Sequence, residues 1–341
     1  MNRTINVTIV GAGHYARDLI ARKYQSRRSC RIRAILSPTV SKATLAAYDL
    51  GKPPLVRSPS EWFRAFGRPT RSDIFDLCVH FPVVPGLVKE LARSGAKNFV
   101  FPKVATLSWE GLRDLLRLKN RSGLRITVAS QWHYSGLMPR LRALLRVLSK
   151  KRKLDRAVFD FSQTFSPEQL DHYSPSNALL PHILQIAYSS GLCRFDGKGD
   201  LKTRQRSWSA LEVRLREKGG LVPEVLFVTD LARARKVRTL SLFVKGETAP
   251  VLTADFIGLP DAGCGEGHWV AREGKKYVVW EDNLKKMVEE TLAAFKSWTR
   301  KKGPALTLER YAPIMRQQIR IEEAMENPSI HPRHPSVGKT P

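Results

Sequence analysis

The chain has 341 residues, of which 58 are Lys or Arg and 31 are Asp or Glu, so its formal net charge is +27. A hydrophobic content of 42% is typical of a globular protein, and the length is sufficient for two domains. The four cysteines lie far apart without a C-x-x-C pair, which excludes a zinc ribbon and argues against a disulfide framework. No apolar run reaches the roughly 18 residues of a transmembrane helix. The first residues lead into an expected strand without an apolar leader, so we expect a cytoplasmic protein with no membrane association.

The positive charge would attract nucleic acid, anionic lipid or an acidic substrate. The densest basic run is RLRALLRVLSKKRKLDR at 140–156. Its Leu141, Leu144, Leu145 and Leu148 are spaced to bury one helix face, which leaves the arginines on the solvated side. No basic strand with interleaved aromatic residues accompanies this run. A solvated helix is therefore favoured over a nucleic-acid site.

In the first half of the chain, short apolar runs alternate with helical patterns. Strands are expected at NVTIVGA (6–12), CRIRAILS (30–37), IFDLCVHF (74–81), KNFVFP (97–102) and LRITVAS (124–130), with helices at 83–95 and 108–121. This alternation predicts parallel βαβ units and a doubly wound sheet. We therefore expect an α/β Rossmann domain over residues 1–130.

The pattern changes after residue 150, where consecutive runs are rich in β-branched and aromatic residues. Strands are expected at 156–165, 223–231, 237–245, 250–259 and 268–281, the last with a turn at 273–275, and helices at 176–190, 283–298 and 308–326. Consecutive strands predict an open-faced, mainly antiparallel sheet. We expect an α+β domain over 131–326 for substrate binding and oligomerisation, followed by a mobile proline-rich tail at 327–341.

A glycine-rich turn follows the first expected strand. It reads G-x-G-x-x-A, with Gly11, Gly13 and Ala16, and it precedes a helical pattern, which is the setting of a dinucleotide-binding turn. Gly11 would permit the tight turn, Gly13 would let a pyrophosphate approach, and Ala16 would allow close packing of the helix on the sheet. His14 and Tyr15 are expected to lie beside the cofactor as turn residues. The alternative is a glycine turn that binds no ligand.

The end of the second strand indicates which cofactor is preferred. NAD-binding domains usually carry an Asp or Glu there for the ribose 2′-hydroxyl. The sequence here is AILSPTVSK, in which Ser37, Thr39, Ser41 and Lys42 offer hydroxyls and a positive charge but no carboxylate. We therefore expect NADP(H) to be preferred over NAD(H). The alternative is that Ser37 only begins the loop.

Residues 99–135 resemble the Glu-Lys-Pro segment of the glucose-fructose oxidoreductase / inositol dehydrogenase / MocA family. Lys103 falls on the motif lysine, with Pro102 in place of the glutamate and Val104 in place of the proline. The resemblance implies that Lys103 bridges the cofactor and the substrate oxygen and assists proton transfer. A desolvated lysine suits that role because its pKa is lowered. The alternative is a surface lysine at the end of a strand.

Other positions extend the resemblance along the chain. Gln131, His133 and Tyr134 fall on the family's Asn, Arg and aromatic positions, and the pair Phe81-Pro82 falls on its Thr-Pro beside the nicotinamide ribose. The resemblance therefore implies that Phe81 and Pro82 contact the cofactor. His133 and Tyr134 are alternative proton donors.

The family also carries Asp-x-x-x-His on a helix of its second domain. The counterpart here is SPSNALLPHILQIAYSSG, in which His182 falls on the catalytic histidine. Ala178 stands at the aspartate position, Gln185 replaces a following aspartate, and Pro181 precedes the histidine. The carboxylate that would orient the imidazole is missing. His182 is therefore either an acid/base catalyst or a structural residue of an apolar helix.

Together these features predict an NADP(H)-dependent oxidoreductase that acts on a small metabolite, which is anionic or carrier-bound. The reaction would be reduction of a C=O or C=N group, as in the thiazolinyl imine reductases of siderophore assembly, or the reverse oxidation. The alternatives are a catalytically altered NADP(H)-binding regulatory protein and a basic nucleic-acid-associated module. The resemblance also implies a homodimer or homotetramer formed through the open face of the sheet.

Overall fold

A computed structural model of the chain describes residues 4–13, 15–41, 53–170, 173–260, 266–297 and 306–326. The chain divides into two compact units. The first comprises Met1–Ser135 and Asp282–Met315, and the second comprises Gly136–Glu281 and Arg316–Pro341. The tail expected at 327–341 and the site candidates His14 and Lys42 lie outside the described residues. No described helix is both long and apolar enough to cross a membrane.

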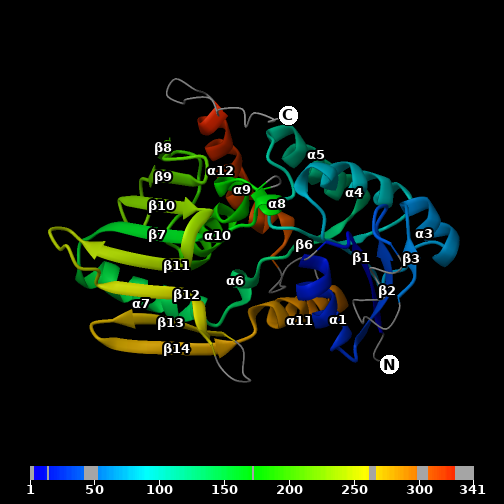
Figure 1. The fold of residues 1–341 in the computed structure, drawn as a ribbon, viewed down its shortest axis with the longest axis horizontal. Helices are drawn as coiled ribbons and strands as arrows, with labels where there is room; N and C mark the ends of the chain where they lie inside the picture. Colours follow the sequence, from blue (N-terminus) through cyan, green and yellow to red (C-terminus); the bar gives the residue numbers. More distant parts are fainter. Residues whose placement is uncertain are drawn as a thin grey trace, which may run out of the picture. The chain divides into compact units, whose positions relative to one another are not determined.

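The first unit is built on a six-stranded sheet in the order β3-β2-β1-β4-β5-β6, in which every neighbouring pair is parallel. Strands β1, β2, β3 and β6 of this sheet are labelled in Figure 1. The strands are β1 Ile5–Val10, β2 Cys30–Leu36, β3 Leu55–Val56, β4 Asp73–Leu77, β5 Asn98–Phe101 and β6 Arg125–Val128. All residues of β4 and β5 are buried, as a parallel sheet covered on both faces requires. This strand order confirms the predicted Rossmann sheet. Strand β3 was not expected from the sequence, because it has only two residues.

The first unit also contains helices and short helical turns, some of which begin at a residue whose side chain caps the helix. They are a π-helix η1 Tyr15–Ala21, α1 Arg22–Gln25, α3 Pro59–Phe66, a 3₁₀ turn η2 Phe81–Val83, α4 Val84–Arg93, α5 Trp109–Ser122, α6 Gln131–Tyr134, α11 Asn283–Lys296 and the first residues of α12 Leu308–Glu326. At α5, the Ser108 hydroxyl accepts a hydrogen bond from the Gly111 amide at 3.1 Å, and Gly123 ends the helix in the left-handed conformation.

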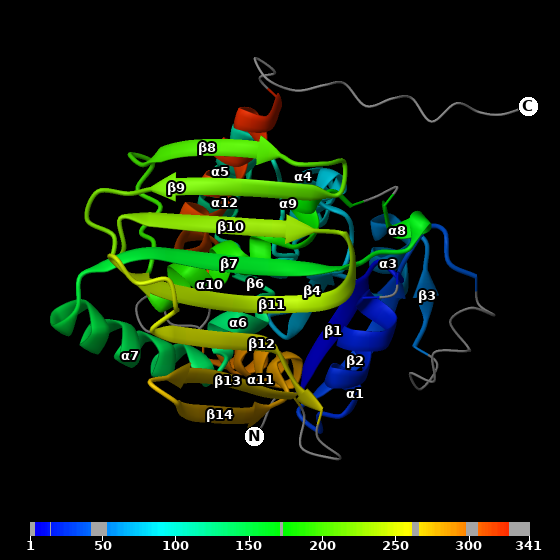
Figure 2. The same ribbon diagram turned by 60° about the vertical axis from the view of Figure 1, so that its left-hand side comes forward.

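The second unit contains an eight-stranded sheet in the order β14-β13-β12-β11-β7-β10-β9-β8 (Figure 2). The strands are β7 Leu154–Thr164, β8 Asp200–Gln205, β9 Ala210–Arg216, β10 Glu224–Asp230, β11 Ala232–Val244, β12 Leu252–Pro260, β13 Glu266–Arg272 and β14 Lys275–Glu281. The β7–β10 pair is parallel and the other pairs are antiparallel. This confirms the predicted, mainly antiparallel sheet.

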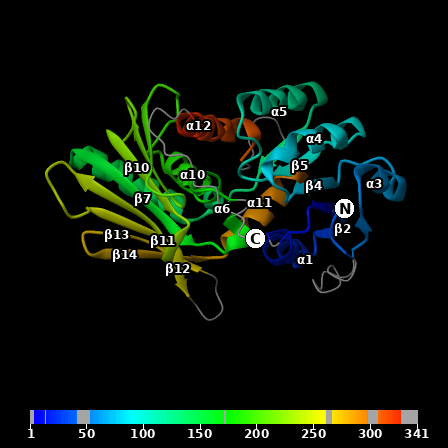
Figure 3. The same ribbon diagram turned by 45° about the horizontal axis from the view of Figure 1, so that its top comes forward.

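Helices cover one face of this sheet, which leaves the other face open (Figure 3). They are α7 Leu137–Lys151, α8 Pro167–Leu170, α9 Pro175–Ala178, α10 Leu180–Ser190 and the last residues of α12. Leu141, Leu145 and Leu148 of α7 are fully buried, and the arginines and lysines of the basic run lie elsewhere on the helix. The predicted amphipathic helix is therefore confirmed, although Leu144, which was expected on the buried face, is only half-buried.

Strands β13 and β14 form a hairpin whose turn consists of Glu273 and Gly274. Both residues have positive φ, 49° and 77°, as a type I′ turn requires. Gly267 of β13 lies opposite Trp280 of β14, and a β-carbon at Gly267 would lie 2.6 Å from the Trp280 ring, so this position favours a glycine. The turn expected at 273–275 is therefore confirmed.

Candidate functional site

The carboxyl edge of the parallel sheet gathers most of the predicted site residues of the first unit. The strands run in the same direction, so the segments that follow them meet at one edge. Gly11 follows β1, Ser37 follows β2, Phe81 follows β4 and Lys103 follows β5. Residues that lie up to 92 positions apart in the sequence (103 − 11) are thus brought to the same edge of the sheet. This edge is the candidate cofactor site.

The first glycine of the turn is required by the protein itself. Gly11 has φ 99°, and its amide donates a hydrogen bond to the Leu36 carbonyl at 2.8 Å. On the other side, the Cys78 amide donates to the Val10 carbonyl at 2.7 Å. A β-carbon at Gly11 would lie 2.4 Å from the Cys78 carbonyl oxygen, closer than real β-carbons approach. The turn is therefore closed against the chain on both neighbouring strands.

The second glycine has a different environment. A β-carbon at Gly13 would meet no described atom within 4 Å. Tyr15 follows as the first residue of η1, and Ala16 is 2% exposed in the first turn of that helix. An open position before a helix N-terminus is where a phosphate group approaches backbone amides in dinucleotide-binding domains. The geometry fits a dinucleotide at this turn.

A buried polar cluster lies beneath the turn. The Tyr24 hydroxyl donates to the Asp76 carboxylate at 2.8 Å, and the Cys78 thiol lies 3.7 Å from the same carboxylate. Burial raises the pKa of Asp76 to about 6, although the hydrogen bonds from Tyr24 and Cys78 oppose this shift. Desolvation also raises the pKa of the Tyr15 phenol well above its usual range, so that Tyr15 stays neutral. This cluster was not expected from the sequence, because its members come from different elements.

The loop after β2 contains a buried serine and an exposed threonine. Ser37 is 4% exposed, and its amide donates to the Val56 carbonyl at 2.9 Å. Thr39 is exposed, and the sequence from 37 to 41 contains no carboxylate. A carboxylate here would repel a 2′-phosphate. The described part of the loop therefore fits NADP(H) at least as well as NAD(H).

The segments after β4 and β5 hold the other candidates of this edge. The Phe81 ring packs against His80 with ring centroids 4.3 Å apart, and Pro82 is exposed beside it. Lys103 lies two residues beyond β5 and is half-buried. An amine at this position lies at the edge to which the other strands bring the turn and the β2 loop.

The two candidates on α6 differ in exposure. The Tyr134 hydroxyl accepts a hydrogen bond from the Leu306 amide at 3.1 Å, and burial raises its pKa to about 12. The His133 ring is half-buried and meets the Tyr134 ring edge-on, with centroids 4.9 Å apart. Tyr134 thus has a structural contact within the first unit, and His133 is the more accessible of the two.

His182 belongs to the second unit, near the start of α10. Its side chain is half-buried, and Pro181 occupies the first turn of the helix, where no backbone N–H donor is needed. Gln185 is fully buried and donates to the Ser189 hydroxyl at 2.5 Å. The position where the family carries a carboxylate thus holds a neutral residue with a structural hydrogen bond. Among the described residues, no group of three or more His, Cys, Asp or Glu is placed to hold a metal ion.

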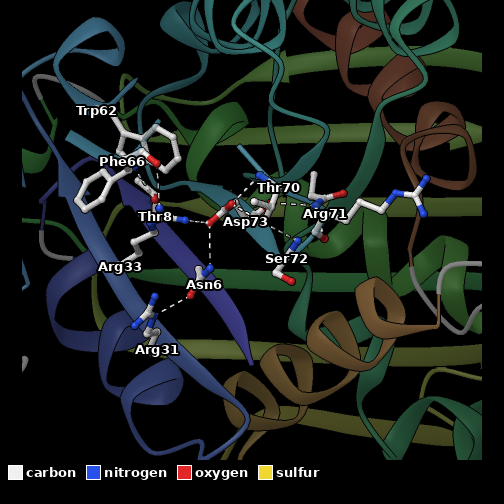
Figure 4. Close-up of polar contacts among 11 residues, drawn as sticks. Asn6, Thr8, Arg31, Arg33, Trp62, Phe66, Thr70, Arg71, Ser72 and Asp73 are labelled. Atoms are coloured by element: carbon white, nitrogen blue, oxygen red, sulfur yellow. Dashed lines mark hydrogen bonds and ion pairs between the residues drawn. The ribbon is translucent and has the colours of Figure 1, made fainter. Parts of the chain in front are cut away.

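The opposite, amino-terminal edge of the first sheet is held by a second polar cluster (Figure 4). The Asp73 carboxylate accepts hydrogen bonds from the Asn6 side chain at 3.1 Å and from the Thr70 amide and hydroxyl at 2.7 Å, and it forms an ion pair with Arg33. The Arg33 guanidinium also lies 4.9 Å from the centre of the Phe66 ring. This cluster joins β1, β2 and β4 at the edge remote from the candidate cofactor site, so its role is structural.

No protein-family model and no curated protein matches the sequence. Solved structures do match it. The UDP-N-acetylglucosamine 3-dehydrogenase GnnA from Acidithiobacillus ferrooxidans is 13% identical with a TM-score of 0.70, covering 94% of this chain and 97% of its own. The 3-ketoreductase KijD10 from Actinomadura kijaniata, in complex with NADP and TDP-benzene, is 12% identical with a TM-score of 0.71, covering 95% and 98%. A candidate myo-inositol dehydrogenase from Sinorhizobium meliloti is 11% identical with a TM-score of 0.67, covering 95% and 98%.

These likenesses extend over nearly the whole of both chains, but the identities are low. They establish the fold, a Rossmann domain combined with an open-faced α+β domain. The predicted resemblance to the glucose-fructose oxidoreductase / inositol dehydrogenase / MocA type of protein is thereby confirmed at the level of the fold.

Proposed function

We propose that the chain is an NADP(H)-dependent oxidoreductase that transfers a hydride between the cofactor and a small, sugar-like metabolite. The observation that carries the proposal is the glycine turn. Gly11 is closed against the neighbouring strand, whereas a β-carbon at Gly13, just before a helix, would meet no described atom within 4 Å. The complex of KijD10 with NADP supports a nicotinamide cofactor on this fold. The carboxylate-free loop at 37–41 supports NADP(H) over NAD(H).

The positive net charge of the chain favours a negatively charged substrate. A net charge of +27 favours an anionic metabolite, because a basic protein concentrates anions near its surface. GnnA is a UDP-N-acetylglucosamine 3-dehydrogenase and KijD10 was solved with TDP-benzene, and both of these ligand classes are anionic. We therefore propose a nucleotide-linked or otherwise anionic carbonyl compound as substrate, with a cyclic imine as the alternative.

Side chains of this chain would donate or accept the proton that accompanies hydride transfer. When bound, the nicotinamide would supply or accept the hydride. Reduction of C=O or C=N leaves an anionic oxygen or nitrogen, and a positioned acid accelerates such a step by roughly 10²- to 10⁴-fold. We assign this role first to Lys103, which follows β5 at the carboxyl edge. His182 and His133 are the next candidates, and each has a half-buried imidazole.

The assignment of Lys103 is tested by Lys103→Met. We expect turnover to fall about 100-fold, since a general acid is lost, while the Kd for NADPH changes less than about twofold. Lys89→Met is the matched control, because Lys89 is exposed on α4. Turnover is followed by NADPH absorbance with a panel of keto nucleotide sugars and cyclic imines. His182→Asn should reduce turnover less. Full turnover in Lys103→Met would show that the family's lysine role does not apply to this chain.

A second candidate function is favoured by the residues that replace the family's carboxylates. Pro102 and Ala178 carry no ionisable group, and Gln185 is buried in a structural hydrogen bond. A chain that binds NADPH tightly but oxidises it with no member of the panel would be an NADP(H)-binding regulatory protein. Binding to DNA or RNA that weakens steeply with salt would instead support the nucleic-acid-associated alternative.

A further inference from the structure

Arg57, the first residue after β3, contacts the loop that follows β2. Strands β2 and β3 are parallel, with Leu36 opposite Val56, so Ser37 and Arg57 leave the sheet side by side at its carboxyl edge. The hydrogen bond from the Ser37 amide to the Val56 carbonyl, 2.9 Å, fixes this register. The two residues are 20 apart in sequence (57 − 37). The contact depends on the pairing of β3, the strand that sequence analysis missed.

The Arg57 guanidinium is held on the loop by backbone carbonyls. Its Nη1 donates to the carbonyl oxygens of Ser37 and Pro38, each at 3.4 Å, and to that of Val40. These contacts all use Nη1, and a guanidinium has further N–H donors on Nη2 and Nε. The side chain is thus oriented along the loop that runs from residue 37 to residue 40, although Arg57 itself is exposed.

The residues from 37 to 41 carry no charge of their own, so Arg57 brings a positive charge to this part of the loop. The nearby Glu61 carboxylate accepts a hydrogen bond from the Arg57 backbone amide at 2.5 Å, and the Glu61 amide donates to the Ser58 hydroxyl at 3.2 Å. The Ser58 hydroxyl thus caps α3, and the Glu61 carboxylate lies at the helix N-terminus, where it accepts from the residue before the cap. The guanidinium contacts the β2 loop, whereas the carboxylate contacts the backbone.

We propose that Arg57 binds the 2′-phosphate of NADP(H) and sets the preference for NADP(H) over NAD(H). The inference rests on the proposed function, because it requires the dinucleotide at this edge. In a doubly wound domain the adenosine ribose lies beside the end of the second strand, which here continues into Ser37. A planar guanidinium binds a phosphate through two parallel N–H···O hydrogen bonds. The carbonyls of the loop hold this guanidinium in position before the ligand arrives.

The test compares Arg57→Gln and Arg57→Lys with the wild type and with Arg64→Gln, a control at an exposed arginine of α3. Calorimetry gives Kd values for NADPH, NADH, 2′,5′-ADP and 5′-AMP, and thermal unfolding confirms that each variant folds. In Arg57→Gln, we expect NADPH and 2′,5′-ADP to bind roughly 10- to 100-fold more weakly, the range for a charged hydrogen-bonded pair. NADH and 5′-AMP should change less than about twofold. Arg57→Lys should restore part of the loss, because a lysine retains the charge but not the fork.

The outcomes separate this inference from the proposed function. If the wild type binds NADPH in preference to NADH, and Arg57→Gln weakens both equally or neither, Arg57 does not recognise the 2′-phosphate and only NADP(H) binding stands. An equal loss for both nucleotides would indicate that Arg57 orders the loop alone. If the wild type binds none of the four ligands, the proposed function fails and this inference fails with it.

Discussion

Replacement of Gly11 by alanine should destabilise the first unit strongly. The new β-carbon would lie 2.4 Å from the Cys78 carbonyl oxygen, at least about 0.6 Å inside the closest contact that real β-carbons show. The backbone of β1 or β4 must therefore move, and overpacking of this kind typically costs about 1–3 kcal/mol. Alanine at φ 99° adds about 1–2 kcal/mol of backbone strain. The free energy of unfolding should fall by about 2–5 kcal/mol.

Gly13→Ala is the matched control for this change. Its β-carbon would meet no described atom within 4 Å, so we expect the free energy of unfolding to change by less than about 1 kcal/mol. Its affinity for NADPH should nevertheless fall, because the methyl group enters the space expected for the pyrophosphate. Urea denaturation followed by circular dichroism measures the stability of both variants, and fluorescence titration measures NADPH binding. Equal stability of Gly11→Ala and the wild type would refute the steric reasoning.

Two pH-dependent predictions concern buried carboxyl groups. The Asp76 carboxyl has a pKa raised to about 6, above an unfolded-state value of about 3.9, so the folded state keeps a proton that the unfolded state has lost. As the pH rises from about 4 to about 6, the free energy of unfolding should therefore fall by roughly 2–3 kcal/mol. Asp76→Asn should remove this pH-dependent fall. An unchanged pH profile in the variant would contradict the prediction. For Asp73, burial alone would raise the pKa, but hydrogen bonds from Thr70 and Arg33 outweigh it and lower the pKa. The contribution of the Asp73 carboxylate to stability is present above its unfolded-state pKa and is lost as the pH falls through its folded-state pKa. Asp73→Asn should therefore lower the free energy of unfolding by about 3 kcal/mol at neutral pH and by less in acid, as measured by urea denaturation. Equal losses at both pH values would count against an ionic role.

The sequence was sufficient for the elements with strong patterns. Strands β1 (INVTIV) and β5 (NFVF) are mostly apolar and lie next to turn residues, and α10 and α11 have regular apolar spacing, so each was expected close to its observed place. Strands β8 and β9 were both missed. The residues of β8, DLKTRQ, are mostly polar and none is fully buried, and β9, ALEVRLR, carries a charged residue at every second position from Glu212 onward. An edge strand needs little apolar surface, so its sequence carries little signal.

The candidate site was predictable only where one short segment carries the pattern. The glycine turn is local, and its spacing identified both Gly11 and Gly13, but only the structure separates the steric need at Gly11 from the open space at Gly13. The contacts of Asp76 with Tyr24 and of Arg57 with the β2 loop join segments that are 52 and 17 to 20 residues apart. Such contacts follow from strand order and register, which the sequence pattern does not specify for each residue.

A crystal structure of the chain with NADP⁺ tests most directly whether the carboxyl edge of the first unit binds the dinucleotide. We predict the pyrophosphate beside the Gly13 amide and the 2′-phosphate within hydrogen-bonding distance of Arg57, at the loop that begins with Ser37. Binding of NADP⁺ at any other surface, or no binding at a saturating concentration of the nucleotide, would contradict the proposed function.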